Sequence, residues 1–472
     1  MGFASPVFLT LFLPFTLLLC AAFRSRVHIQ NLCLTVLSLL FYAWGEPVYL
    51  LVLVALAACN GALAKGIARG RGSARDLWTA VAIVLNIGVL FGFKYLGFFV
   101  ATANAVFSLS LPVPQVALPL GISFFTFQAL SYVLDVRMGK SAPAKDGGTL
   151  LLYLCLFPQL IAGPILRWHT VADQFQRRCM TMDGTALGIR RFILGLSKKV
   201  LLADVLGKVA DAAFLCPGDA LGAPLAWLGA ASYTLQIYLD FSAYSDMAIG
   251  IGRVLGFTFP ENFLHPLRAG SMQSFWRRWH ITLTDWFRDY LYIPLGGNRK
   301  GRLRTYVNLS AVFLFTGLWH GARWTFVLWG AWNGLFVILE RAGMLRAGTR
   351  RIGKWRSAVA HAYTLAVVLL GFVLFRAETV AQALAYGRSM FMQFAMTPLR
   401  ASYLLEQCTP MNLAALGAAV AVSLNAFSRL RTRLAKQPLA NAASYVLCCV
   451  LLLGCYAAIV ASGHHPFIYF RF

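Results

Sequence analysis

The chain has 472 residues, of which 59% are hydrophobic and only 12% are charged, and its mean hydropathy is +0.67. Soluble globular proteins carry about 25% charged residues, so this composition excludes that class and predicts a polytopic membrane protein. The net charge of +25 comes from 42 basic and 17 acidic residues. Because the basic residues are dispersed among loops, they favour anionic lipid and not nucleic acid as the partner.

Nearly charge-free runs recur along the chain, and each is close to the roughly 20 residues that cross a bilayer core. They lack the two-residue alternation of a barrel strand, so they predict helices. The runs are Pro6 to Phe23, Val48 to Leu63, Leu77 to Phe93, Val116 to Leu134, Leu150 to Ile165, Leu225 to Leu239, Phe326 to Leu339, Ala358 to Phe375, Leu413 to Phe427 and Ala442 to Val460. We expect an all-α fold with about ten to twelve crossings. No linker or internal repeat divides the chain, which favours one integral-membrane domain over residues 1–472.

The loop charges predict the topology. Basic residues follow the runs that end at Phe23, Leu63 and Leu134, namely Arg24 and Arg26, "KGIARGRGSAR" and "RMGKSAPAK". Such loops are cytoplasmic under the positive-inside rule, which puts the N-terminus outside. The first run has no basic residue before it and is longer than a signal core, so we expect it to remain as a span. The basic stretch from Arg429 to Lys436 puts the C-terminal "GHHPFIYFRF" outside as well.

One charged stretch interrupts this apolar chain, "SFWRRWHITLTDWFRDYLYIPLGGNRKG" at residues 274–301. Trp276, Trp279 and Tyr290 recur in it at helical spacing and predict one amphipathic helix with an aromatic face. That periodicity alone favours an interfacial helix that lies flat on the membrane. A flat surface helix has no special need for His280 beside its apolar face, so His280 is a candidate site residue.

A second histidine, His320, lies inside the apolar segment "LSAVFLFTGLWHGARWTFVLWGAWNG". An ionisable side chain at membrane depth is a functional candidate, and the alternative is a histidine that hydrogen-bonds a neighbouring helix. The other histidines lie near loops, run ends or the C-terminus and are expected to be solvated or structural: His28, His169, His265, His361, His464 and His465. The ten cysteines show no metal-ligand spacing, so we predict no metal site.

Several motifs follow one another along the chain: "FYAWGEP", "LPLGISFFTFQALSYVLDV", "LFPQLIAGPILR", "QIYLDFSAYSDMAIGIGRVLGF", the charged stretch above, "GLWHGARWTFVLWG" and "PFIYFRF". In these motifs the chain resembles the membrane-bound O-acyltransferase family, in the bacterial branch that acts in alginate O-acetylation or in D-alanyl transfer to lipoteichoic acid. The motif "YIPLGGNRKG" is closer to the acetylating members. Many of those have a histidine where this chain has Asn333, so Asn333 is expected to be non-essential or to have a different role.

The resemblance implies about eleven spanning helices with re-entrant segments around a central tunnel. It also implies that His280 and His320 are the two active-site positions. His320 would be the base for the acceptor hydroxyl, and His280 would be the polar partner that orients the donor or the oxyanion. An acyl-histidine intermediate is the alternative route. Asp240, Asp246 and Trp319 would line the tunnel, or the two aspartates would be structural.

The implied reaction moves an acetyl group from a cytoplasmic thioester, acetyl-CoA, across the bacterial cytoplasmic (inner) membrane for O-acetylation of an exported polysaccharide. No permanently bound cofactor is expected. Arg288, Arg299 and Lys300 would contact the phosphates of coenzyme A, with lipid headgroups as the alternative. The outward loops are short, so a separate extracytoplasmic partner would modify the glycan, whose identity stays open.

Two other functions are compatible with the sequence. One is D-alanyl transfer from a carrier protein to a cell-wall polymer. The other is a membrane transporter that uses Asp240 and Asp246 as a proton or substrate path. The chain shows no inverted repeat and no paired broken helices, which are typical of transporters, so the enzyme is favoured.

Overall fold

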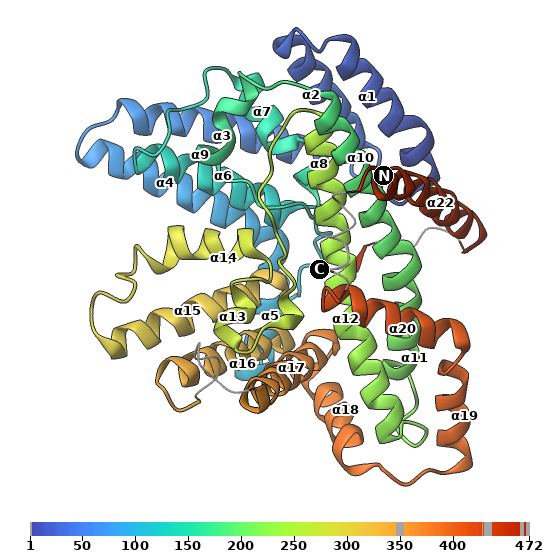
Figure 1. The fold of residues 1–472 in the computed structure, drawn as a ribbon. Coiled ribbons are helices and arrows are strands. Elements are labelled where there is room, and N and C mark those ends of the chain that lie inside the picture. Colours follow the sequence, from blue (N-terminus) through green and yellow to red (C-terminus); the bar gives the residue numbers. More distant parts are fainter. Residues whose placement is uncertain (1, 346–353, 427, 429–436, 463–466, 469–472) are drawn as a thin grey trace. The chain divides into compact units, whose positions relative to one another are not determined.

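The computed structural model describes residues 2–345, 354–426, 428, 437–462 and 467–468, and every regular element in these residues is a helix (Figure 1). The predicted all-α class is therefore confirmed. Three features used above lie outside the described residues: the basic stretch from Arg429 to Lys436, and His464 and His465.

The chain forms two compact units. Of the described residues, unit 1 comprises those up to Phe192 and Tyr244–Glu261, and unit 2 comprises Ile193–Ala243 and those from Asn262 to Ile468. The 32-residue helix α12, Ala223–Val254, contributes residues to both units. That residues 1–472 act as a single integral-membrane domain stays a prediction.

Unit 1 is built mainly from helices that begin before residue 192, and the last of them, α10, continues past Phe192 into unit 2. They are η1 (Phe8–Phe12), α1 (Leu13–Ala22), α2 (Val27–Ala43), α3 (Leu50–Arg69), α4 (Ser73–Leu90), η2 (Phe91–Tyr95), α5 (Leu96–Phe107), α6 (Ile122–Arg137), α7 (Gly147–Cys155), α8 (Phe157–Leu160), α9 (Trp168–Val171), η3 (Ala172–Phe175) and α10 (Met182–Ser197). Helices α3, α4 and α6 pack against one another (Figure 1). Between α3 and α4 the fully buried amides of Asn60 and Asn86 bond each other in both directions, at 3.2 and 2.7 Å. Such a polar pair fixes the register of two apolar helices.

Unit 2 contains the charged stretch and His320. Its helices are η4 (Lys198–Ala203), α11 (Asp204–Phe214), part of α12, η5 (Pro266–Arg268), α13 (Met272–Trp276), α14 (Ile281–Phe287), η6 (Arg288–Tyr292), α15 (Arg302–His320), α16 (Trp324–Arg341), α17 (Lys354–Arg376), α18 (Val380–Met392), α19 (Pro398–Gln407), α20 (Pro410–Ser423) and α22 (Pro438–Ser462). Helices α15 and α16 form a tight hairpin, and α13 and α17 pack against α16 (Figure 1).

The predicted spans differ in how well they hold as helices. Among the described residues, four helical stretches are long and apolar enough to cross a membrane: Leu50–Arg69, Ser73–Phe107, Trp355–Arg376 and Ala442–Ala461. The run Leu150 to Ile165 is not one helix, because α7 ends at Cys155 and only the one-turn α8, with Pro158 in it, follows. Proline lacks the backbone donor that a continuing helix needs. The run from Val116 becomes helical only at Ile122.

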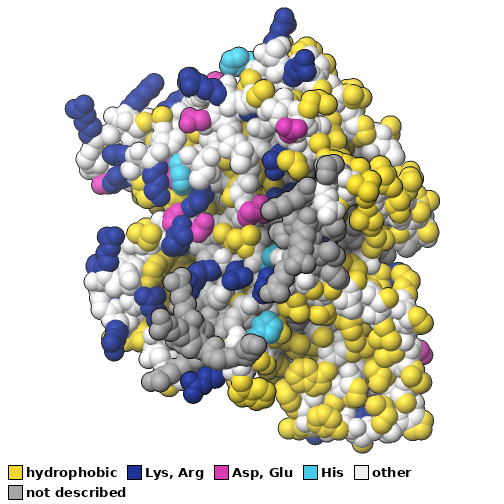
Figure 2. Space-filling model, in the orientation of Figure 1, with side chains coloured by type: hydrophobic (Ala, Val, Ile, Leu, Met, Phe, Trp, Pro, Cys, Tyr) yellow, Lys and Arg dark blue, Asp and Glu magenta, His cyan; other side chains and the backbone are white. Residues whose placement is uncertain are grey.

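Large apolar side chains cover the outer surfaces of several helices. In α22, Leu439 is 83% exposed and Leu453 is 70% exposed, and in α19 Leu405 is 70% exposed. Figure 2 shows hydrophobic side chains in yellow over the region of α19 at the lower right. A soluble monomer does not expose such continuous apolar surface, whereas a lipid-facing helix does. The chain is a membrane protein.

Candidate active site

The charged stretch is broken where the sequence predicts a continuous helix. Helix α13 ends at Trp276 and α14 begins at Ile281, and His280 between them has a φ of 43°. The prediction of one amphipathic helix is therefore wrong, because a left-handed residue cannot continue a right-handed helix. His280 is fully buried and Trp279 is 1% exposed, so this segment is packed inside the protein and does not lie flat at a membrane surface.

Two main-chain hydrogen bonds hold the break on either side of His280. The N–H of Ile281 donates to the carbonyl oxygen of Asn262 at 2.9 Å, and the N–H of Leu264 donates to the carbonyl oxygen of Arg278 at 3.0 Å. These bonds replace the helical ones that the turn gives up. The segment from Asn262 to Leu264 thereby fixes the backbone from which the His280 ring projects.

The second histidine ends a helix that is clamped to its neighbour. His320 is the last residue of α15 and is 2% exposed. A Cβ atom added to Gly317 would meet the carbonyl oxygen of Phe326 on α16, and one added to Gly321 would meet the Phe326 ring. Because only glycine fits at both places, the α15–α16 hairpin closes tightly and sets the position of His320.

The two imidazole rings lie close together, although 40 positions separate them in the sequence numbering. Their centroids are 6.5 Å apart with an interplanar angle of 62°. Trp319 contacts both rings, at 5.8 Å from His280 and 5.1 Å from His320. With centroids 6.5 Å apart, the rings are too far from each other for a direct ring-to-ring hydrogen bond. The structure therefore brings together His280, His320 and Trp319, while a tunnel through this point stays a prediction.

Aromatic side chains complete the surroundings. Phe241 on α12 lies 4.7 Å from His280, and Trp329 and Phe375 lie 5.1 and 5.2 Å from His320, in each case between ring centroids. This enclosure keeps water away, which strengthens every electrostatic interaction inside it. His280 lies outside the four candidate spans, and its burial lowers its pKa to about 3. Its imidazole is therefore neutral at physiological pH and available for proton transfer or hydrogen bonding.

Asn262 belongs to no pattern in the sequence that singles it out, and the structure adds it to the site. Its side chain is fully buried, and its Oδ1 atom lies 3.1 Å from Nδ1 of His280. Oδ1 also accepts a hydrogen bond from Oγ1 of Thr282 at 2.9 Å. Asn262 precedes His280 by 18 positions on a segment that is not helical, so no helical or strand period links the two.

The basic residues predicted to contact the donor lie on the outside. Arg288 forms ion pairs with Asp285 and Asp289, at 2.7 and 2.8 Å, whereas Arg299 and Lys300 are exposed in the turn that follows η6. These contacts with donor phosphates stay a prediction. Arg288 is the weakest candidate, because two carboxylates already neutralise its charge.

The two predicted aspartates each have a cationic partner. Asp240 in unit 2 is 1% exposed and lies 2.8 Å from Nζ of Lys199, which also lies 2.7 Å from Asp204. Asp246 in unit 1 lies 2.8 Å from the guanidinium of Arg191. Paired carboxylates of this kind are typical of structural roles, which favours the structural alternative over a proton path.

Three of the remaining histidines have the surroundings expected of solvated or structural side chains. His28 is exposed, His169 lies 2.8 Å from the carboxylate of Asp135, and Nδ1 of His361 lies 3.1 Å from the carbonyl oxygen of Ala269. None of them shares an aromatic enclosure of the kind that surrounds His280 and His320.

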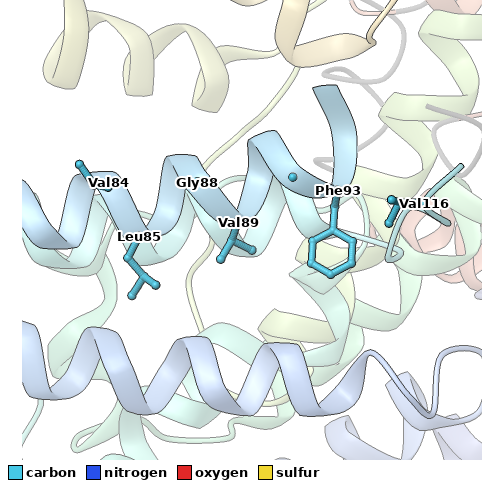
Figure 3. Close-up of a pocket in the computed structure, with 7 residues that line it drawn as sticks. Val84, Leu85, Gly88, Val89, Phe93 and Val116 are labelled. Carbon is cyan, nitrogen blue, oxygen red and sulfur yellow. The ribbon is translucent and has the colours of Figure 1, made fainter. Parts of the chain in front are cut away.

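One cavity of the described chain is apolar and shares no lining residue with the histidine site. It has a volume of about 510 Å³ and lies along α4 and η2 of unit 1 (Figure 3). Leu85, Val89 and Phe93 line it from the helix, and Val116 lines it from the following loop (Figure 3). Its lining contains no titratable side chain, so it is not a place for acyl transfer.

This chain belongs to the membrane-bound O-acyltransferase family, and the family's model matches residues 148–376, a range that includes both buried histidines. It is therefore an acyltransferase, and the resemblance seen in the motifs is confirmed. Among its relatives, a Pseudomonas putida protein named "Probable alginate O-acetylase AlgI" is 42% identical over 83% of this chain and 80% of its own length. The peptidoglycan O-acetyltransferase of Helicobacter pylori is 35% identical over 82% of this chain and 79% of its own length. The teichoic acid D-alanyltransferase of Bacillus subtilis is 24% identical over 54% of this chain and 68% of its own length.

Proposed function

We propose that this chain transfers an acetyl group from a cytoplasmic thioester, acetyl-CoA, for the O-acetylation of an exported polysaccharide. The relatives named as O-acetylating enzymes are 42% and 35% identical and align over more than four fifths of the chain, whereas the D-alanyltransferase aligns over 54% at 24% identity. This difference supports acetyl over D-alanyl as the group transferred.

The observation that carries the proposal is the pair of buried imidazoles inside one aromatic enclosure. Acyl transfer from a thioester forms a bond between the acceptor oxygen and the acyl carbon and breaks the bond between that carbon and sulfur. His320 is the base that takes the hydroxyl proton and later returns it to the thiolate, so that free thiol leaves. His280 is the polar partner that orients the reactants, and an acyl-histidine intermediate is the alternative route.

The membrane arrangement forms part of the proposal. About eleven spans with re-entrant segments surround a tunnel, with the thioester entering from the cytoplasm and the hydroxyl from the opposite face. Arg299 and Lys300, with Arg288 beside them, bind the phosphates of coenzyme A. The enzyme lies in the bacterial cytoplasmic membrane with both termini outside, and a separate extracytoplasmic protein passes the acetyl group to the glycan.

The donor is tested with the purified chain and its candidate partner. Radiolabel from acetyl-CoA should appear on the partner or on the glycan, and it should be absent when His320 is replaced by alanine. Labelling only from D-alanyl carrier protein would replace acetyl by D-alanyl in the proposal.

The partner is tested in vesicles that hold the donor inside and the glycan outside. Acetylated glycan should form only when the extracytoplasmic protein encoded beside this chain is added. Efficient glycan acetylation by the chain alone would overturn the relay and would mean that the site itself admits the sugar hydroxyl. Substrate flux without any acyl release would favour a transporter.

A further inference from the structure

The side-chain oxygen of Asn262 is the meeting point of three hydrogen-bonding atoms in unit 2. Nδ1 of His280 lies 3.1 Å from it, Oγ1 of Thr282 lies 2.9 Å from it, and the main-chain nitrogen of Thr282 lies 3.4 Å from it. Asn262 and His280 are both fully buried, so bulk water does not compete for these positions. The cluster is therefore a fixed polar contact at the base of the candidate site.

The chemistry of these atoms decides which way the amide of Asn262 faces. The main-chain N–H of Thr282 can only donate, so the Asn262 atom directed at it must be the oxygen and not the nitrogen. An amide oxygen can only accept. The Nδ1 atom of His280 must therefore carry a hydrogen and donate it to Asn262.

The other ring nitrogen of His280 has the opposite character. A neutral imidazole carries one hydrogen, so a hydrogen on Nδ1 leaves a lone pair on Nε2. Nε2 is buried and has no hydrogen-bond partner among the described residues. A buried acceptor without a hydrogen bond destabilises the folded protein, unless a group of the substrate donates a hydrogen bond to it. The proposed base His320 lies nearby, with its ring centroid 6.5 Å from that of His280.

We infer that Asn262 is a positioning residue that holds His280 in the tautomer with hydrogen on Nδ1, so that Nε2 accepts a hydrogen bond from an O–H or N–H group of the substrates. This inference rests on the proposed function and narrows one part of it. A neutral His280 in this tautomer cannot donate to the oxygen of the thioester. It therefore orients a hydrogen-bearing reactant and does not stabilise the oxyanion, which must find its donor elsewhere.

Solid-state nitrogen NMR of the full-length chain, labelled with ¹⁵N-histidine and reconstituted in lipid, reads the tautomer directly. Loss of signals in His280→Gln assigns the His280 ring. At neutral pH we expect a protonated Nδ1 and an unprotonated Nε2 in the native chain, and a mixture or the opposite tautomer in Asn262→Leu. Hydrogen on Nε2 in the native chain, or an unchanged tautomer in Asn262→Leu, would overturn the inference. Because no acyl transfer is measured, this result is independent of the proposed substrate.

Kinetics of acyl transfer separate positioning from mere packing. Asn262→Leu keeps the size of the side chain and removes the acceptor, and we expect kcat to fall by about 10- to 100-fold, the usual loss when a group that orients an active-site histidine is removed. Asn262→Asp keeps an acceptor for Nδ1–H. It should retain more activity than the leucine variant and shift the acidic limb of the pH–rate profile to higher pH, because the carboxylate stabilises the imidazolium.

The matched control is Asn333→Leu, which removes another buried asparagine of unit 2. Its Nδ2 atom donates to the carbonyl oxygen of Trp329 on its own helix at 2.8 Å. We expect near-native turnover and an unchanged His280 tautomer in this variant. Equal losses in Asn262→Leu and Asn262→Asp at normal folded yield, with no shift of the pH profile, would contradict the positioning role. If the leucine variant does not fold, the tautomer and the pH profile of Asn262→Asp still decide.

Discussion

Two buried polar clusters of unit 2 have contrasting designs. In the first, Lys199 lies 2.8 Å from Asp240 and 2.7 Å from Asp204, and the N–H of Ile468 donates to the second oxygen of Asp240 at 2.7 Å. In the second, the neutral ring of His280 is held through Nδ1 by Asn262, while Nε2 has no partner among the described residues. In the first cluster one ammonium is shared by two carboxylates, whereas in the second a buried hydrogen-bond acceptor has no partner among the described residues.

The contrast indicates a structural role for the Lys199 cluster and a chemical role for the His280 cluster. A buried charge is tolerated only when it is paired, so the Lys199 cluster joins η4, α11, α12 and the described residues Phe467 and Ile468. An open buried acceptor has no stabilising role of its own and gains a partner only when substrate arrives. The following variants test whether the two clusters differ in this way, from the largest expected effect to the smallest.

His320→Ala should abolish acyl transfer while expression and membrane insertion stay normal. The imidazole is the proposed base, and its loss leaves no group to take the hydroxyl proton. Transfer of radiolabelled acetyl groups by the purified variant measures the effect. His361→Ala is the matched control, since Nδ1 of that ring lies 3.1 Å from a main-chain oxygen, that of Ala269. Near-native turnover by the His320 variant would remove His320 from the mechanism.

Asp240→Ala should destabilise the protein strongly. Removing a partner that leaves a buried charge alone costs about 3–5 kcal/mol, and that range is the upper bound here because Lys199 keeps Asp204 as a partner. The main-chain N–H of Ile468 also loses its acceptor. Thermal unfolding in detergent measures the loss, and Asp246→Ala provides the comparison, since its pair with Arg191 is partly exposed and should matter less. The triple variant Lys199→Met with Asp204→Asn and Asp240→Leu, which removes every charge of the cluster, should recover part of the stability. An unchanged unfolding temperature in Asp240→Ala would show that this cluster is not structural.

His280→Ala should lower the rate of acyl transfer by about 10²-fold or more, the usual cost of removing one oriented acid–base or hydrogen-bonding group. Its unfolding temperature should change less than that of Asp240→Ala, because the substitution removes no member of a buried ion pair. Steady-state kinetics with the donor varied give kcat and KM separately. A change in donor KM with kcat preserved would make His280 a binding residue.

Arg299→Ala combined with Lys300→Ala should raise the KM for acetyl-CoA a few-fold and leave kcat unchanged. Both side chains are exposed, so contacts with donor phosphates are screened and individually weak. With a dephospho-coenzyme A thioester as donor, the KM values of the variant and the native chain should differ less, because one phosphate contact is then absent in both. If KM does not move, lipid headgroups are the better partner for these residues.

The sequence predicted the fold class of this protein better than the local structure around its candidate site. The apolar runs predicted an all-helical membrane protein because lipid requires each backbone polar group to be satisfied within the segment, which a helix does locally. His320 is a candidate because an ionisable residue in an apolar run is costly, although a structural hydrogen bond would explain it as well. The break before α14 was missed, since the aromatic residues keep helical spacing across it, and spacing does not report a single left-handed residue at His280.

Composition, apolar run length and motifs determined on their own that this chain is an α-helical membrane acyltransferase. They also made His280 and His320 its candidate site residues. Only the tertiary structure decided that the two rings lie 6.5 Å apart, that Asn262 orients one of them, and that Lys199 neutralises Asp240. The physical reason is the range of the interactions. Hydropathy and periodicity depend on how each residue interacts with solvent and with its near neighbours along a helix. A hydrogen bond or ion pair between segments far apart in the sequence depends on how those segments pack.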